Sequence, residues 1–334
     1  MSVDPEIAAI PFYPIPEGES YCEVTPLVNA ILEIPEFNII TPATSKTAGY
    51  DAPTFSFFIK HHPSGKTLFF DLGIRADWQT GFADDLKGYI LAGPPVMLGD
   101  VGEILKEGGE NPEEVSAVVI SHRHWDHTGN ISPFPKAEVV GGIDTFDADL
   151  GRQTAGRQTL VVDWSKVKSS KVASFGHGYD YFGDGSIWLV DSAGHTAGHL
   201  SALIRTTPSP NATYVLLSGD TCHHPVLISP ATHHFRLATF PVRGSEENPR
   251  QHPALPPPCC MHSDMSRAWD TVCRTRRVEA EDNIMVVLAH DYVYWREWKG
   301  AEDRLWPSKK GIQGWKTEGL KLERKYEPEK YDRQ

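Results

Sequence analysis

The stretch "AVVISHRHWDHTGN", from Ala117 to Asn130, decides the fold and the chemistry of this chain. It opens on branched apolar residues, which favour a buried strand. Three histidines and one aspartate follow within six residues, as His122, His124, Asp126 and His127. Imidazole and carboxylate groups are the ligands that zinc and similar ions take in proteins. One isolated histidine would suggest a structural role, but four ligand types in this order predict a metal-binding loop at the end of a strand.

Length and composition limit the class of protein. The 334 residues, 40% hydrophobic and 23% charged, are typical of a globular chain with one large domain or two ordinary ones. A net charge of -12 argues against nucleic acid and membrane partners, because both need clustered Lys and Arg. We therefore expect a small-molecule substrate, while the oligomeric state, including a homodimer, stays open.

Two features of the sequence indicate a cytoplasmic protein. The first twenty residues, "MSVDPEIAAIPFYPIPEGES", carry acidic groups and lack the apolar core of a signal peptide. The five cysteines form no CxxC pair and no even framework, which favours reduced thiols.

The pattern of apolar runs and turns predicts a mixed α/β chain. Two runs, 54–61 and 66–71, read as a hairpin with its turn at Ser64 and Gly65, and short strands follow at 117–121, 137–140 and 186–190. A helical insertion spans about 74–114, and "MSRAWDTVCRTRRVEA" predicts a later helix. We expect an N-terminal extension over 1–50, the main domain over 51–310, a proline-rich lid at about 222–260, and a charged tail over 311–334.

Three further strand ends carry ligand-type residues. His195 lies in "DSAGHTAGH", Asp220 ends "LLSGD", and His290 lies in "VVLAHD". Each follows an apolar strand, so one rim of a sheet could gather them beside the first loop. This is a constellation of sites rather than one local motif.

The order HxHxDH, GHTxGH, SGD and a late AH resembles the metallo-β-lactamase-fold hydrolases, and is most similar to their acyl-homoserine-lactone lactonase branch. The resemblance spans about 54–291 and implies an α/β fold, a four-layer αββα sandwich with a dinuclear metal site at one sheet edge. It assigns His122, His124 and His195 to a first metal, and Asp126, His127 and His290 to a second. Asp220 would bridge the two metals, and Asp71 would support the metal loop.

Seven ligands exceed the needs of one tetrahedral zinc but suit two ions that share a carboxylate. Flavodiiron relatives carry a carboxylate in the first motif, so His122 and His124 favour zinc and hydrolysis. We therefore predict a dizinc hydrolase, a lactonase or lactamase that opens a small cyclic ester or amide by attack of a metal-bridging hydroxide. A thioesterase or glyoxalase-II-like hydrolase is the alternative, with "RTRR" at 274–277 as its one candidate anion site, and a mononuclear iron persulfide dioxygenase is a third reading.

The sequence departs from the lactonase pattern at one position. The lactonase branch places a tyrosine three residues after the bridging aspartate, whereas this chain has His223. A histidine, with an ordinary pKa near 6.5, releases a proton more readily than a tyrosine near 10. We therefore take Asp126, Asp220 and His223 as the candidate catalytic residues, with His223 assisting the leaving group. Lactone, lactam and thioester substrates all stay open.

Several other residues have two readings each. His199 either supports the metal ligands or is structural, and His224 either contacts substrate or belongs to the lid. Cys222 is a possible soft ligand, although the histidine-rich site has no obvious vacancy for it. The aromatic residues of the insertion and loop, which line either the core or an apolar substrate wall, are Trp78, Phe82, Tyr89 and Trp125.

Overall fold

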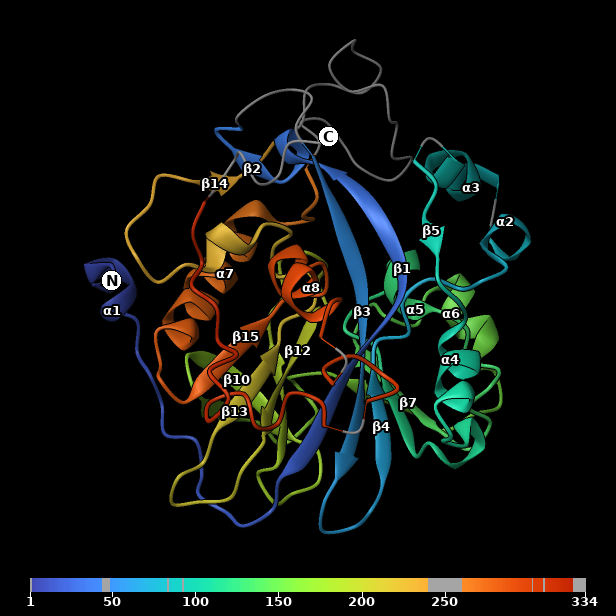
Figure 1. Ribbon diagram of the computed structural model, residues 1–334, viewed down its shortest axis with the longest axis horizontal. Helices are drawn as coiled ribbons and strands as arrows, with labels where there is room; N and C mark the ends of the chain where they lie inside the picture. The colour runs from blue at the N-terminus through green and yellow to red at the C-terminus, as the bar shows by residue number, and fades with distance from the viewer. Residues whose placement is uncertain are drawn as a thin grey trace.

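The computed structural model of the protein describes residues 2–43, 49–82, 84–91, 93–239, 260–301, 303–308 and 310–326. Two large β-sheets form its centre (Figure 1). The first has seven strands in the order β5-β1-β3-β4-β6-β7-β8. Their bounds are β1 Cys22–Pro35, β3 Gly49–His61, β4 Thr67–Phe70, β5 Val96–Met97, β6 Ala117–Val119, β7 Glu138–Gly142 and β8 Thr159–Val162.

The second sheet has six strands in the order β15-β13-β12-β11-β10-β9. Their bounds are β9 Ser170–Val172, β10 Phe175–Asp180, β11 Ile187–Asp191, β12 Leu200–Arg205, β13 Tyr214–Leu217 and β15 Ile284–Val287. A small third sheet pairs β2 (Ile40–Thr41) with β14 (Arg236–Leu237).

Helices and short 3-10 turns connect and cover the strands. The helices are α1 Pro5–Ala8, α2 Trp78–Gly81, α3 Asp84–Leu91, α4 Val101–Glu107, α5 Trp125–Thr128, α6 Ala148–Gln153, α7 Met265–Glu279 and α8 Tyr292–Trp298. The 3-10 turns are η1 Glu36–Asn38, η2 Pro112–Glu114 and η3 Pro225–Ile228. Within the described ranges, no helix has both the length and the apolar character to span a bilayer.

Alternating side chains build four layers. Successive residues of a strand point to opposite faces, so Leu68 and Phe70 of β4 pack between the two sheets while Phe69 faces outward. Helix α4 covers the outer face of the first sheet, and α7 covers that of the second (Figure 1). The αββα sandwich expected from the sequence is therefore present, and its central core contains side chains from both sheets.

Parallel strand pairs bring the ligand-bearing loops to one edge. The predicted hairpin is β3 paired with β4, and β4 runs parallel to β6 with Phe70 opposite Val119. In the second sheet β13 runs parallel to β15, with Leu217 opposite Val287. Parallel strands end at the same side of a sheet. The loops after β4, β6, β13 and β15 therefore leave each sheet in a common direction.

The N-terminal region differs from the expected extension, because β1 pairs with β3 along the sheet. The strand escaped sequence analysis for a physical reason. Pro26 and the polar Asn29 interrupt its apolar pattern, and the pairing shifts register between Val28 and Ile31. Such a bulge breaks the period of two by which a strand is recognised.

The insertion and the proline-rich segment are described in part. The insertion contains α2, α3, β5 and α4, and Trp78 and Phe82 are buried, while the side chain of Tyr89 lies outside the described residues. Residues 222–229 pack in the core, in contrast to the expected lid, because the apolar face of η3 lies against α7. Residues 240–259 of the expected lid lie outside the described residues.

The C-terminal region also differs from the expected charged tail as far as residue 326. Ile312 and Trp315 are buried in the core between the sheets. Arg324 is buried and donates to both carboxylate oxygens of Asp291, at 3.0 and 2.9 Å, and to Val286 O. The sequence did not predict that this region is buried, because a charged residue in a buried ion pair cannot be told from a solvated one by its sequence alone.

Candidate metal site

Asp71 ties the loop after β6 to the end of β4. Its backbone is left-handed, with φ of 59°, which turns the carboxylate toward the loop. Oδ1 accepts from Ser121 N at 2.7 Å, and Oδ2 accepts from Ser121 Oγ at 2.8 Å. His127 donates its Nδ1 proton to the same Oδ2 at 2.8 Å, because an ionised carboxylate only accepts. Nε2 of His127 is thereby left as the nitrogen that can bind a cation.

Three histidine nitrogens converge beside this loop. His124 Nδ1 lies 2.9 Å from His122 Nε2, and His195 Nε2 lies 2.8 Å from the former and 3.1 Å from the latter. Oδ2 of Asp220 is 3.6 Å from His122 Nε2 and 3.4 Å from His195 Nε2. Ligand atoms of these four residues all lie within 4.8 Å of one another. The structure thus brings the predicted first-metal residues together with Asp220.

The predicted second-metal residues form an adjoining group. Asp126 Oδ2 lies 3.4 Å from His290 Nε2, and Asp126, His127 and His290 offer ligand atoms within 4.8 Å of one another. Asp220 reaches this group too, with Oδ2 3.2 Å from His127 Nε2 and Oδ1 3.4 Å from His290 Nε2. His290 donates its Nδ1 proton to Pro53 O at 2.8 Å, which directs its other nitrogen to the carboxylates. Asp220 therefore lies between the two groups.

These residues fit a metal on two grounds. His127 Nε2 and Asp220 Oδ1 are buried and make no well-directed hydrogen bond among the described residues, only the ion-pair contacts of 3.2 and 3.4 Å, although buried polar atoms are normally hydrogen-bonded. Three mutually facing ring nitrogens also cannot all be satisfied by shared protons. Ligands at a zinc–nitrogen distance of about 2.0–2.1 Å in a tetrahedron are about 3.3 Å apart, close to the separations seen.

The electrostatics of the cluster favour added positive charge. Burial, reinforced by neighbouring imidazoles, holds the pKa of His122 and of His195 well below the ordinary value. Both rings are therefore neutral, and each can offer a nitrogen lone pair to a metal. Burial also opposes the charged form of His290, but Asp220 and Asp126 outweigh it and raise its pKa to about 10. Without a cation, the buried carboxylates thus draw protons onto His290 and likewise onto His127. A bound metal would replace those protons.

The loop after β13 fixes Asp220 from behind. His199 Nε2 accepts from Asp220 N at 2.9 Å, and its Nδ1 lies 2.8 Å from Ser192 Oγ. Gly219 has φ of +53°, and a Cβ there would lie 2.7 Å from His199 Nε2, so the close approach requires glycine. His199 is therefore a hydrogen-bonded support of Asp220.

Of the other residues singled out in the sequence, some lie inside the cluster of ligand groups and some lie outside it. His223 lies inside it, with Nε2 3.0 Å from Asp220 Oδ2. His224 lies outside, where its Nδ1 accepts from Val226 N at 3.1 Å and its Nε2 lies 3.2 Å from Tyr292 Oη. Cys222 packs in the outer core and belongs to none of the ligand groups that the described residues form. Trp125 packs with Phe82 in the apolar cluster formed largely by β1, β3 and the insertion.

His262 is a residue that sequence reasoning missed. It is 4% exposed and belongs to a ligand group with His195 and His223. It lies in "MHSD", just before α7, and no apolar run precedes it in the sequence to suggest a strand end. The sequence offered one sign of its role: His262 lies beside the start of a predicted helix, in a segment that is otherwise rich in proline.

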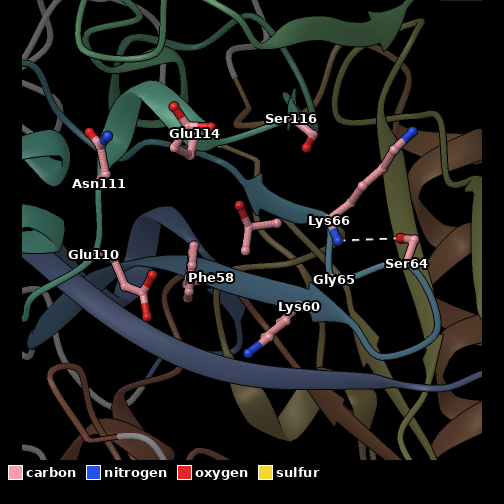
Figure 2. A pocket seen from close by; sticks show the side chains of 10 residues that line it. Phe58, Lys60, Ser64, Gly65, Lys66, Glu110, Asn111, Glu114 and Ser116 are labelled. Carbon is pink, nitrogen blue, oxygen red and sulfur yellow. Dashed lines mark hydrogen bonds between the residues drawn. The ribbon is translucent and has the colours of Figure 1, made fainter.

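A separate surface pocket lies at the opposite ends of β4 and β6. It has a volume of about 380 Å³ and is lined by residues that include Lys60, Lys66, Glu110 and Glu114 (Figure 2). Thr67 and Ser116, at the starts of these strands, line it as well. The predicted site residues all follow strand ends, so the pocket contains none of them.

Comparisons with known proteins agree with this geometry. A family model described as the metallo-beta-lactamase superfamily matches residues 49–143. The metallo-hydrolase mfmC of Annulohypoxylon moriforme is 31% identical over 314 residues, which cover 85% of this chain and 80% of that protein. The gamma-lactamase FDB1 of Fusarium pseudograminearum is 30% identical over 351 residues, which cover 92% of this chain and 81% of that protein.

A solved structure shows the same fold. The crystal structure of a B. thuringiensis AiiA mutant with N-decanoyl-L-homoserine at its active site superposes with a TM-score of 0.57 at 14% identity. The superposition covers 86% of this chain and 98% of that one. With its αββα fold, its His/Asp metal-binding cluster and these relatives matched over most of their length, the chain belongs to the metallo-β-lactamase superfamily of metal-dependent hydrolases.

Proposed function

We propose that this metallo-hydrolase opens a small cyclic amide or cyclic ester at a centre of two zinc ions. The observation that carries the proposal is the position of Asp220, whose two carboxylate oxygens face both ligand groups. A carboxylate between two histidine groups suits a pair of ions that share one ligand. The relative named a gamma-lactamase supports a cyclic amide as the substrate class.

The chain offers a complete ligand set for two ions. We assign His122, His124 and His195 to one ion, Asp126, His127 and His290 to the other, and Asp220 to both. When bound, two zinc ions supply a hydroxide near neutral pH and a Lewis acid for the carbonyl. Asp71, Pro53 O and His199 orient three of these ligands by hydrogen bonds, so the site is fixed before substrate arrives.

His223 is the proposed proton donor to the leaving group. Its Nε2 faces Asp220 Oδ2 at 3.0 Å, and because the carboxylate only accepts, Nε2 carries the proton. The ring is 3% exposed, so water reaches this proton poorly. An amide nitrogen must be protonated as its C–N bond breaks, and such general acid help contributes roughly 10²–10⁴-fold. The replacement of tyrosine by histidine therefore suits a substrate with a poor leaving group.

The thioesterase alternative gains no support from the arginines of α7. Arg274 pairs with Asp270, Arg277 pairs with Glu281, and Arg276 is buried and donates to Ser229 O and Ala231 O. These guanidinium groups hold the helix in place. A cluster occupied in this way is a poor site for the anionic group of a thioester carrier.

The test combines metal analysis with a substrate screen on one preparation. Protein produced with zinc should contain two zinc ions per chain and should hydrolyse γ-lactams and lactones faster than thioesters. Exclusive thioester hydrolysis would favour the glyoxalase-II-like reading. A single iron, with oxygen uptake on persulfides, would overturn hydrolysis altogether.

A further inference from the structure

We propose that Arg324 is a positioning residue for His290, the last metal ligand in the chain, and that it acts through Asp291. Asp291 follows His290 directly, and Arg324 donates to both of its carboxylate oxygens, at 3.0 and 2.9 Å. Both partners are buried, with exposures of 3% for Arg324 and 0% for Asp291. The inference rests on the proposed function, because His290 is assigned there to the second ion.

Asp291 closes the short loop that presents His290 between β15 and α8. One carboxylate oxygen accepts from Leu288 N, before the ligand, at 3.3 Å. The other accepts from Tyr294 N, in the first turn of α8, at 3.3 Å. One carboxylate thus holds the chain on both sides of His290. A guanidinium that binds both oxygens fixes the direction of that carboxylate, since two parallel bonds allow one orientation.

The segment that carries Arg324 is itself held against the second sheet. This C-terminal strap, residues 320–326, contacts β15, which lies at the end of the strand order of that sheet. Lys321 donates to Ile284 O at 2.6 Å, and Arg324 donates to Val286 O at 2.6 Å. The two side chains therefore satisfy main-chain carbonyls of an edge strand, which otherwise lack partners. Arg324 is fixed to the same strand whose end leads to His290.

The ion pair also keeps Asp291 apart from the metal ligands. His290 Nε2 faces Asp126 and Asp220, the two carboxylates assigned to the ions. Asp291 is the next residue along the chain, yet it belongs to none of the ligand groups formed by the described part of the protein. A buried ion pair adds little net stability compared with apolar side chains of similar volume. The contribution that we assign to Arg324 is therefore geometry at the second ion.

The test is a titration of the metal-stripped full chain with Co²⁺, followed by equilibrium dialysis and elemental analysis. Arg324→Lys keeps the charge but loses the two-pronged contact. The second ion should then bind about 10-fold more weakly, at the lower end of the range for residues that orient metal ligands, while the first ion keeps its affinity. Asp291→Asn should have the same effect, and it covers the case in which Arg324→Lys fails to fold. The double variant should lose no more than either single variant, because the two residues act as one unit.

Arg205→Lys is the matched control for loss of a buried guanidinium. Arg205 is fully buried as well, but it donates to Ser20 O and Pro16 O. It is paired with Tyr214 at the start of β13, whereas Asp220 follows the end of that strand. This control should lower the unfolding temperature as Arg324→Lys does, but the affinity for both ions should stay at the wild-type value.

The outcomes separate this inference from the proposed function. A second ion bound as tightly by Arg324→Lys and Asp291→Asn as by the wild type would overturn the positioning role and leave the two-ion centre in place. Equal weakening in Arg205→Lys would overturn the role too, because lost stability would then explain the effect. A wild type that binds fewer than two Co²⁺ ions would overturn the proposed function and the inference with it. Weaker binding of the second ion alone, confined to the Arg324 and Asp291 variants, supports the inference.

Discussion

The two ends of the first sheet both carry a buried histidine close to an aspartate, yet the two kinds of histidine differ. At the hairpin end, His61 has a partner on each nitrogen, with Ser64 Oγ at 2.7 Å and Asp184 Oδ2 at 2.9 Å. At the metal end, His122, His124 and His195 direct nitrogens at one another. A histidine whose two nitrogens both have hydrogen-bond partners needs no ligand. Histidines whose nitrogens face one another need a cation between them. The surroundings, and not the residue type, distinguish a structural histidine from a ligand.

Of these substitutions, Asp220→Ala should have the largest effect on metal binding and activity. The change removes the one carboxylate that both groups share and leaves His127 and His290 with fewer acceptors. We expect loss of at least one ion and a fall in activity beyond the about 10–100-fold typical of changes to supporting residues. Elemental analysis and kcat/KM measure the effect. His61→Asn at the hairpin end should keep its metal, and a metal-replete Asp220→Ala enzyme would contradict the bridging role.

His223→Phe should separate substrates by leaving group. Loss of the proton at Nε2 removes general acid help, so amide ring opening should fall by roughly 10²–10⁴-fold. Activated esters need no such proton and should lose far less. Parallel kcat measurements on a γ-lactam and an aryl ester give the comparison, with metal content checked in each sample. Equal losses on the two substrates would remove His223 from the reaction.

Asp71→Asn should weaken metal binding without removing a ligand. An amide oxygen can still accept from Ser121 N, but the second oxygen, which accepts from His127, is replaced by an amide nitrogen that donates. We expect metal affinity to fall about 10–100-fold, as for other partners of metal-binding histidines. Competition with a chelator measures the change. Unaltered affinity would mean that packing alone orients His127.

His224 should behave as a structural histidine in a measurement of stability against pH. Burial lowers its pKa to about 3, and Val226 N already occupies Nδ1, so the folded protein holds the ring neutral. An unfolded chain binds that proton below about pH 6.5, so the stability is present above this pH and is lost as the pH falls toward 3.

The size of that loss is measurable. Between pH 7 and pH 5 this group alone should lower the free energy of unfolding by about 2 kcal/mol. Urea denaturation of the wild type and of His224→Asn at the two pH values isolates the contribution. The variant should show the smaller pH dependence, and equal slopes would mean that His224 is protonated in the folded state.

The sequence by itself determined the strands that precede the candidate ligands and the loop that contains four of them. His122, His124, Asp126 and His127 could be predicted because they lie within six residues and follow an apolar strand, so local spacing fixes their neighbourhood. His195, Asp220 and His290 could be added because each follows a strand, and parallel strands end together. Local sequence patterns are sufficient to predict a site when regular strand pairing determines which residues are neighbours in space.

Only the tertiary structure decided the rest. Strand β1 lies beside β3 despite a broken pattern, because long-range pairing compensates for Pro26 and a bulge. Arg324 is a buried partner of Asp291, although its sequence reads as a charged tail. His262 reaches the cluster through two main-chain bonds between a loop and the segment before α7, and no periodicity encodes such bonds. Contacts made by irregular segments depend on packing between distant parts of the chain, which a single sequence does not display.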